Sequence, residues 1–446
     1  MTTVTEITHA RIARIAVPVV LSNATVPLLG AVDTAVIGQL GQAAPLGAVG
    51  MGAVILATLY WAFGFLRMST SGLAAQAQGA GDGAERSAVL LRAVLVALAA
   101  GAALILGQSL LISAAFRIAP ASAEVESLAK TYLAIRIWGA PATIALYALT
   151  GWLVGVERTK GVLILQLWQN GLNIVLDLWF VLGLGWGIEG VAAATLIAEI
   201  TGLALALWLA RDALTPDTLR AACARLFDRA ALGRMFTASR DIMGRTILLQ
   251  LSFTSFVFLG ARFGDVTLAA NQVLMQFLEI TAYALDGFAI AAETLVGQAM
   301  GARALPQVRR AGRICMQWGF GGAALLALAF AALGGPIIDL MTTAPEVRIE
   351  ARSYLWWLIA APLIGVASWI YDGIFIGALQ TRAMLRTMAL SVMVYVGALA
   401  VLIPAFGNHG LWAGLMVLNL TRGLTMWRAY PRVLAAPGGS FNASST

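Results

Sequence analysis

The sequence predicts an all-α membrane protein with twelve transmembrane helices, in two six-helix lobes related by a parallel internal repeat. Three observations lead to this fold class: the composition is strongly apolar, apolar runs of spanning length follow one another, and the chain resembles itself at a fixed offset. Of the 446 residues, 60% are hydrophobic and 11% are charged. A soluble domain has about 25% charged residues, so lipid is the expected solvent for this chain.

Twelve apolar runs are long enough to cross the hydrocarbon core, which takes roughly 20 helical residues. The segment 211–235 contains Pro216 and many charges but no such run, so it is expected to be a cytoplasmic linker. This divides the chain into an N-terminal lobe at 1–210, a C-terminal lobe at 236–432 and a disordered tail at 433–446. The expected spans are 12–37, 46–72, 88–115, 131–153, 161–183, 188–210, 236–260, 267–295, 311–334, 353–377, 386–405 and 410–430.

The basic residues predict the orientation. Of the 29 Lys and Arg residues, 20 lie at span ends and loops on the same side of the membrane as the N-terminus. Five lie in the loops on the opposite side, and four lie within spans. Cytoplasmic loops carry the excess of Lys and Arg in membrane proteins. We therefore expect a multi-pass protein of the bacterial inner membrane with both termini in the cytoplasm.

Other classes of protein are disfavoured by the same composition. The two cysteines, Cys223 and Cys315, fit neither a metal spacing nor a disulfide framework, and the two histidines are far apart. The formal charge of +7 is spread between apolar blocks, which argues against nucleic acid. The apolar run after Arg14 is too long for a cleaved signal peptide. We expect a monomer with no metal and no cofactor, whose partners are lipids and small molecules.

An internal repeat appears when the chain is shifted by 222 residues. Each repeat contains six spans, an even number, so both halves begin on the same side of the membrane. Many transporters are built from such repeats, with the substrate site between them. The matched positions include Gly151 with Gly373, Gly155 with Gly377, and segment 76–80 with 298–302.

Polar residues in three spans of the N-terminal half are expected at similar depth. Asp33 lies on span 1, Asn173 and Asp177 share one face of span 5, and Thr195 lies on span 6. Ionisable groups within a membrane are costly and are functional by default. Carboxylate, carboxamide and hydroxyl oxygens suit a proton or a hard cation such as Na⁺. The alternative is that Asp33 and Asp177 only form ion pairs with Arg67 or Arg136.

Span 8 carries a second polar pattern. Four polar residues are seven positions apart, and a helix drifts only about 20° per heptad, so they form one stripe. A largely acidic stripe suits the wall of a cavity for a cationic amphiphile. For Glu293 alone, a salt bridge to Arg303 or Arg309 is an equal alternative. The residues of this stripe are Gln272, Glu279, Asp286 and Glu293.

Further polar residues and a proline stand within spans. Asp372 is either functional or paired with Arg386, and Arg245 and Arg422 are expected to be counter-ions. Pro27, six residues before Asp33, is a candidate hinge of the first helix, because proline permits a kink. A static bend is an equal alternative.

Several of these motifs resemble one transporter family. The segment 27–38, with Asp33-Thr34 and Ile37-Gly38, resembles the first helix of the multidrug and toxic compound extrusion (MATE) family. The run 282–301 is similar to the DNA-damage-inducible (DinF-like) branch, as are Asn271-Gln272 and the segment 372–377. The resemblance covers nearly the whole chain.

The resemblance implies two six-helix lobes that alternate between inward- and outward-open states and exchange organic cations or other amphiphiles for H⁺ or Na⁺. It places the cation site on Asp33, Asn173, Asp177 and Thr195, and the helix-1 bend at Pro27. The sodium-coupled branch has a glutamate on helix 7, where this chain has Arg245 and no glutamate, which favours protons.

Two alternatives to a proton-coupled exporter remain at this point. A flippase for lipid-linked oligosaccharides, from the wider superfamily, would share the architecture but is expected to have a more cationic cavity to hold pyrophosphate. A membrane-embedded transferase would carry a large polar loop with catalytic residues, and no expected outer loop is long enough.

Overall fold

The computed structural model describes residues 6–39 and 43–435, apart from the side chains of residues 26–31 and 34. All twelve apolar runs are largely helical, although a turn at 62–64 interrupts the run 46–72 and a turn at Gly107 interrupts the run 88–115. In this part of the chain, nine helical segments are long and apolar enough to cross a membrane. The other three expected spans fall on α1, α8 and α16, which carry Asp33, Asp177 and Arg422 respectively. The fold is that of an all-α membrane protein.

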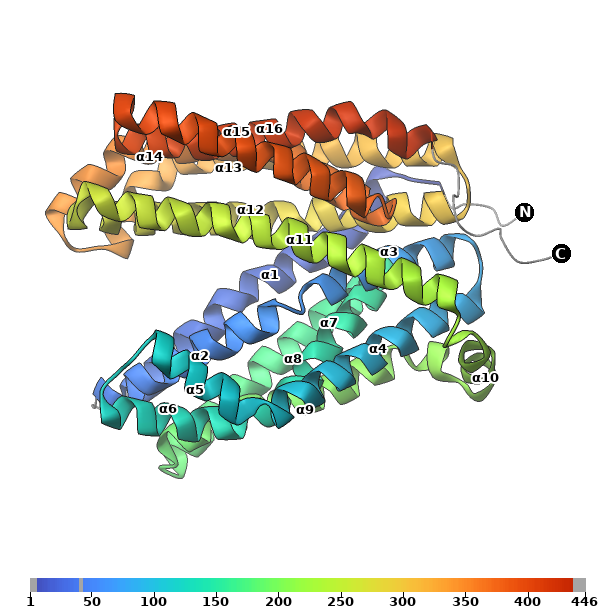
Figure 1. Cartoon of the computed structure of the whole chain (residues 1–446), viewed down its shortest axis with the longest axis horizontal. Coiled ribbons are helices and arrows are strands. Elements are labelled where there is room, and N and C mark those ends of the chain that lie inside the picture. Colours follow the sequence, from blue (N-terminus) through green and yellow to red (C-terminus); the bar gives the residue numbers. More distant parts are fainter. Residues whose placement is uncertain (1–5, 40–42, 436–446) are drawn as a thin grey trace. The chain divides into compact units, whose positions relative to one another are not determined.

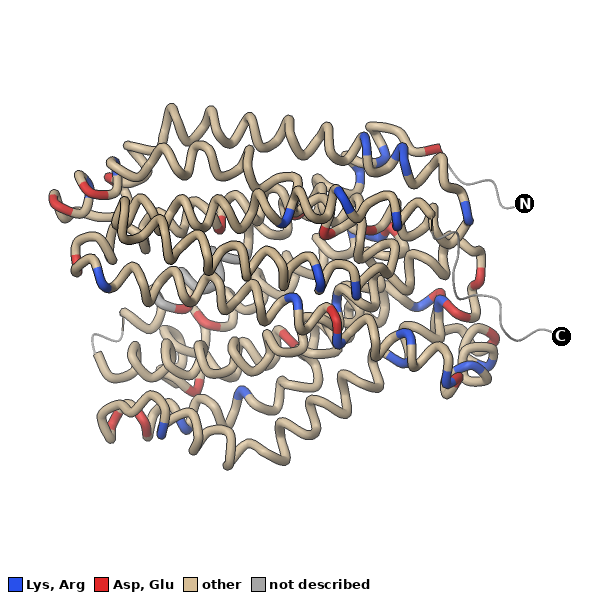
Figure 2. Tube along the Cα trace, turned by 45° about the horizontal axis from the view of Figure 1, so that its top comes forward, with Lys and Arg blue, Asp and Glu red and all other residues tan. Residues whose placement is uncertain are grey.

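The chain forms two compact units. We call residues 21–78 and 82–235 the N-terminal unit, and residues 6–20, 79–81 and 236–435 the C-terminal unit. Figure 1 follows the helices in sequence order, and Figure 2 shows that Lys and Arg gather toward one end of the helices in each unit. The helices begin with α1 (His9–Gly38), α2 (Ala43–Trp61), α3 (Phe65–Gly79), α4 (Gly83–Leu106), α5 (Gln108–Ile118), α6 (Ala123–Arg136), η1 (Ile137–Gly139), α7 (Ala140–Gly155), α8 (Thr159–Asp177), η2 (Leu178–Gly183), α9 (Gly187–Leu209), η3 (Arg211–Leu214) and α10 (Pro216–Arg225). They continue with α11 (Arg229–Gly260), η4 (Ala261–Phe263), α12 (Asp265–Gly301), α13 (Leu305–Met341), α14 (Pro345–Gly377), α15 (Thr381–Phe406) and α16 (Asn408–Ala435).

Helix α1 is divided between the two units, which differs from the expected lobe at 1–210. Its first half packs in the C-terminal unit, where Arg11 Nη2 donates to Gln298 Oε1 at 2.8 Å. A Cβ at Gly287 of α12 would lie 2.8 Å from the carbonyl oxygen of Ala16. The glycine therefore lets the two helices approach closely, which boundaries drawn from apolar runs do not reveal.

The segment 211–235 is largely helical and belongs to the N-terminal unit. Arg158 holds Asp212 with two hydrogen bonds of 2.5 and 2.7 Å, and Arg225 donates to Asp82 at 2.6 Å. Burial alone would raise the pKa of Asp82, but hydrogen bonds from the Glu85 N–H and Arg225, with the charge of Arg225, hold it below its usual value. These contacts fix α10 against α4. At the other end of the chain, α16 continues to Ala435, so the start of the expected tail is helical and residues 436–446 lie outside the described part.

Glycine contacts repeat in the two units at the offset found in the sequence. A Cβ at Gly151 of α7 would lie 2.2 Å from the Arg67 carbonyl oxygen of α3, and one at Gly373 of α14 would lie 2.0 Å from that of Ala289 of α12. Arg67 and Ala289 are themselves related by the same offset. A Cβ at Gly155 would likewise lie 2.5 Å from the Ser71 carbonyl oxygen, and one at Gly377 would lie 2.2 Å from that of Glu293. Each unit thus contains the same close helix crossing.

Gly373→Ala is expected to destabilise the C-terminal unit. The new methyl group would meet a backbone carbonyl at 2.0 Å, so α14 and α12 must separate, and overpacking of this kind costs about 1–3 kcal/mol or more. Gly397→Ala in α15 is the matched control, because nothing lies within 4 Å of its Cβ position. The apparent melting temperature of the purified protein should fall for Gly373→Ala and hold or rise for Gly397→Ala. Equal values for the two variants would contradict the close crossing.

Candidate functional site

The four residues expected to bind a cation come together in the N-terminal unit. Asn173 Nδ2 donates to Thr195 Oγ1 at 3.0 Å, and Thr195 Oγ1 donates to the Val191 carbonyl oxygen at 3.0 Å. The carboxyl groups of Asp33 and Asp177 lie within hydrogen-bonding reach of each other. Asn173 is 1% exposed and Asp177 is fully buried. The cluster therefore joins α1, α8 and α9 in a largely buried setting.

Local helix geometry places these side chains. Asn173 and Asp177 are four residues apart on α8, so both occupy one face of the helix. Asp177 is the last α-helical residue, and the chain continues from it as a π-helical stretch, η2. Such stretches are rare and occur frequently at functional sites. This π-helical stretch was not predicted, because no residue pattern marks it.

Four buried oxygen atoms of this cluster lack hydrogen-bond donors among the described residues. Asp33 Oδ1, Asn173 Oδ1 and both carboxylate oxygens of Asp177 are buried without a hydrogen-bond partner in the described part of the chain. Buried acceptors without donors are costly. Two facing carboxylates add like-charge repulsion. A proton or a cation relieves both costs, and the ligand set contains only oxygen.

The nearby arginines do not complete this site. Arg136 donates to Glu199 of α9 through both terminal nitrogens, at 2.6 and 2.9 Å, so both of these donors are already used. Gly139 makes room for that pair, since a Cβ there would lie 2.3 Å from Glu199 Oε2. For Arg67, Nη1 is buried without a hydrogen-bond partner among the described residues. The ion pairs considered as the alternative role of Asp33 and Asp177 are therefore not formed with Arg136 or with this nitrogen of Arg67. Pro27 lies within α1, but its side chain is outside the described part.

The polar stripe on α12 varies in exposure along the helix. Gln272 and Glu279 are exposed and Asp286 is half-buried. Glu293 is 2% exposed, at the crossing where its carbonyl oxygen meets Gly377 of α14. The first three residues are thus accessible from one side of the C-terminal unit, whereas Glu293 is enclosed by helix packing.

A buried charge network lies elsewhere in the C-terminal unit. Asp372 of α14 accepts hydrogen bonds from Arg245 of α11 and from Arg422 of α16, the latter at 2.6 Å. Its partners are therefore the two arginines expected to be counter-ions, rather than Arg386. All three side chains are less than 10% exposed. A further buried acid, Asp241 in the first half of α11, was not predicted; it accepts from Thr381 Oγ1 at 3.2 Å.

Comparison with known proteins identifies the family. The MatE family model matches residues 18–179 and 242–402. The chain is 41% identical to DNA damage-inducible protein F of Escherichia coli K12 over 422 residues, covering 94% of this chain and 92% of that protein. It is 30% identical to the probable multidrug resistance protein NorM of Deinococcus radiodurans, covering 93% and 92% of the two chains.

Solved structures agree on the fold. A crystal structure of MATE in the bent conformation superposes with a TM-score of 0.86 at 20% identity, covering 95% of both chains. The bent form of the Vibrio cholerae MATE transporter VcmN gives a TM-score of 0.84 at 23% identity, covering 96% and 97%. The chain belongs to the MATE family of membrane transporters and is not an enzyme.

Proposed function

We propose that this protein exports organic cations or other amphiphilic compounds in exchange for a coupling cation, which we infer to be H⁺, by alternating access across the inner membrane. The observation that carries the proposal is the buried oxygen cluster around Asp33 and Asp177, whose acceptors lack donors. The absence of a glutamate on α11, where the sodium-coupled branch has one, supports protons over Na⁺. The name of the D. radiodurans relative, a probable multidrug resistance protein, also supports export.

The mechanism follows from the electrostatics of the cluster. A proton that binds the facing carboxylates of Asp33 and Asp177 removes a negative charge from a buried site. This lowers the cost of the conformation that encloses the pair. One elementary charge crossing 100 mV supplies about 2.3 kcal/mol, and a pH gradient adds to it. Asn173 and Thr195 hold one another in place beside the pair through their 3.0 Å hydrogen bond.

The substrate path in this proposal includes the α12 stripe. Gln272, Glu279 and Asp286 are accessible side chains on one helix, and two are acidic, which suits a cationic amphiphile. Glu293 belongs to the same stripe but is enclosed, so we assign it a supporting role at the crossing with α14. We further propose that both termini lie in the cytoplasm, where the basic helix ends would lie, and that the protein works as a monomer.

The test is transport in proteoliposomes. Efflux of the fluorescent cation rhodamine 6G should follow an imposed pH gradient with Na⁺ absent, and should stop when an uncoupler collapses the gradient. Efflux driven only by a Na⁺ gradient at uniform pH would show that the coupling ion is Na⁺ instead of H⁺. Absence of efflux with either gradient would contradict dye export, and flipping of a fluorescent lipid-linked oligosaccharide should then be measured.

A further inference from the structure

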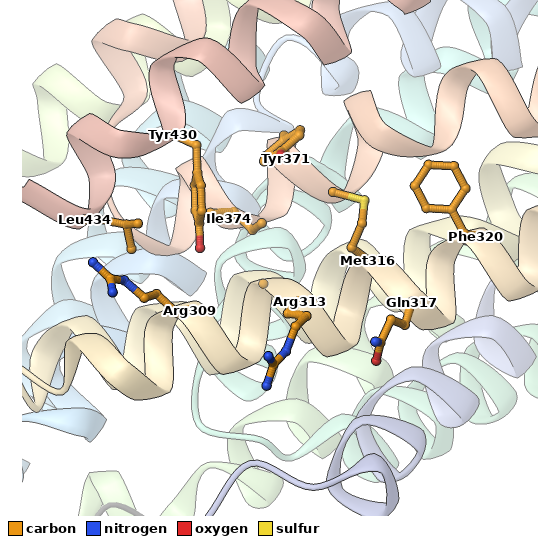
Figure 3. Close-up of a pocket in the computed structure, with 10 residues that line it drawn as sticks. Arg309, Arg313, Met316, Gln317, Phe320, Tyr371, Ile374, Tyr430 and Leu434 are labelled. Carbon is orange, nitrogen blue, oxygen red and sulfur yellow. The ribbon is translucent and has the colours of Figure 1, made fainter.

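A groove separate from the cation cluster lies in the C-terminal unit, between α13, α14 and α16 (Figure 3). Its volume is about 680 Å³. Figure 3 shows Tyr430 reaching from α16 toward α13, with Arg309 beside Leu434. The groove is lined by Arg309, Gly312, Arg313, Met316, Gln317, Phe320, Tyr371, Ile374, Tyr430 and Leu434.

The groove is polar along one edge and apolar along the other. Arg309, Arg313 and Gln317 are four residues apart on α13, and so are Gly312, Met316 and Phe320. Residues at this spacing form rows along a helix. In Figure 3, Met316 and Phe320 point to the side of α13 where Tyr371 lies, whereas Arg313 and Gln317 point to the opposite side. Arg309 and Phe320 are about 16 Å apart along the axis, at 1.5 Å per residue. The charged residues lie toward the beginning of α13, and the exposed ring of Phe320 lies toward its apolar middle.

Gly312 forms the floor of the groove. A Cβ at this position would lie 3.0 Å from the Tyr430 hydroxyl and 3.4 Å from Ile374 Cδ1. Tyr430 in turn packs beside Tyr371, with ring centroids 5.8 Å apart. The missing side chain therefore leaves room under a phenol hydroxyl that can donate a hydrogen bond.

The charge of the groove is positive and uncompensated. The neighbouring Arg310 forms an ion pair with Glu6 at 2.9 Å. No such pair is formed by Arg309 or Arg313 among residues 6–39 and 43–435, and none of the lining residues is acidic. The Arg309 guanidinium beside the Tyr430 hydroxyl, with the positive charge of Arg313 one turn along α13, is suited to a phosphate group.

We propose that this groove binds one anionic phospholipid, with its phosphate held by Arg309 and Tyr430, the charge of Arg313 attracting it from one turn away, and an acyl chain along Met316 and Phe320. A lipid accounts for the apolar edge, which a free phosphate ion would leave uncovered. Basic pockets between membrane helices on the cytoplasmic side bind anionic lipid headgroups. The assignment to the cytoplasmic leaflet rests on the proposed orientation, whereas binding itself is independent of the proposed transport function.

The test compares lipids on detergent-purified full-length protein. Dioleoyl phosphatidylglycerol should raise the apparent melting temperature of the wild type, and a retained lipid should be seen by native mass spectrometry. Arg309→Gln with Arg313→Gln should lose the retained lipid and more than half of the shift. The matched control is Arg382→Gln with Arg386→Gln, an exposed pair with the same spacing on α15 outside the groove, which should respond as the wild type does.

A second variant fills the groove without changing its charge. Met316→Trp should also lose the lipid while keeping both arginines. The proposal is overturned if the Arg309/Arg313 variant responds like its control, or if phosphatidylcholine binds the wild type as well as phosphatidylglycerol. It is also overturned if inorganic phosphate gives the whole shift, because the ligand would then be the free ion.

Discussion

Asp33→Asn is expected to abolish ion-driven efflux of rhodamine 6G while the protein stays folded. Asparagine keeps the size of the side chain but cannot bind the coupling proton. In the wild type the Asp33 and Asp177 carboxyls face each other without donors from the described residues, so removing one of them relieves like-charge repulsion. Transport should fall to the level of protein-free liposomes, and the apparent melting temperature should hold or rise.

The control for this experiment is a carboxylate outside the cluster. Glu126→Gln changes an acid that is ion-paired with Lys130 at 3.4 Å at the surface, and it should keep wild-type efflux. Exposed pairs of this kind contribute about 0–1 kcal/mol to stability. Wild-type efflux by a folded Asp33→Asn variant would show that the cluster is structural, and coupling would then have to be sought on the α12 stripe. Loss of folding would show that Asp33 is part of the packing.

Much of the fold could be predicted from the sequence because lipid imposes a simple rule. Each span must be a helix of about 20 apolar residues, so the twelve runs could be read from hydropathy. The glycines at 151, 155, 373 and 377 were visible as a repeat, but not as the points where α7 meets α3 and α14 meets α12. The packing of the first half of α1 in the C-terminal unit was missed, because it depends on a close approach at Gly287.

The candidate site was predictable for a similar reason. Helix depth alone brings Asp33, Asp177 and Thr195 to one level, and the i, i+4 spacing adds Asn173. The depth of a residue in its helix does not determine which acidic and basic side chains form ion pairs. Arg136 was considered as a partner of Asp33 or Asp177, and only the structure shows both of its terminal nitrogens bound to Glu199. A pair with Arg386 was one of two alternatives for Asp372, whereas its partners come from α11 and α16.

Asp372→Asn is expected to be strongly destabilising. Arg245, Asp372 and Arg422 are buried together, so the network carries one net positive charge, and the substitution raises this to two. Removing one partner of a buried pair costs about 3–5 kcal/mol, because the remaining charge is left without compensation. The apparent melting temperature and the yield of folded protein should both fall. Asp339→Asn is the control in the same unit, because its pair with Arg352 is exposed and contributes little.

The double variant Asp372→Asn with Arg245→Met separates electrostatics from packing. It returns the buried charge to a single arginine, Arg422, which still has the Asn419 side chain as a hydrogen-bond acceptor at 3.3 Å. If uncompensated charge causes the loss, the second substitution should recover part of the stability that the first removed, although it deletes a further polar contact. If the double variant is less stable than the single one, the role of Asp372 is to pack the α11, α14 and α16 helices together. Partial recovery would instead identify Asp372 as the neutralising charge that lets two arginines remain in the interior of a membrane protein.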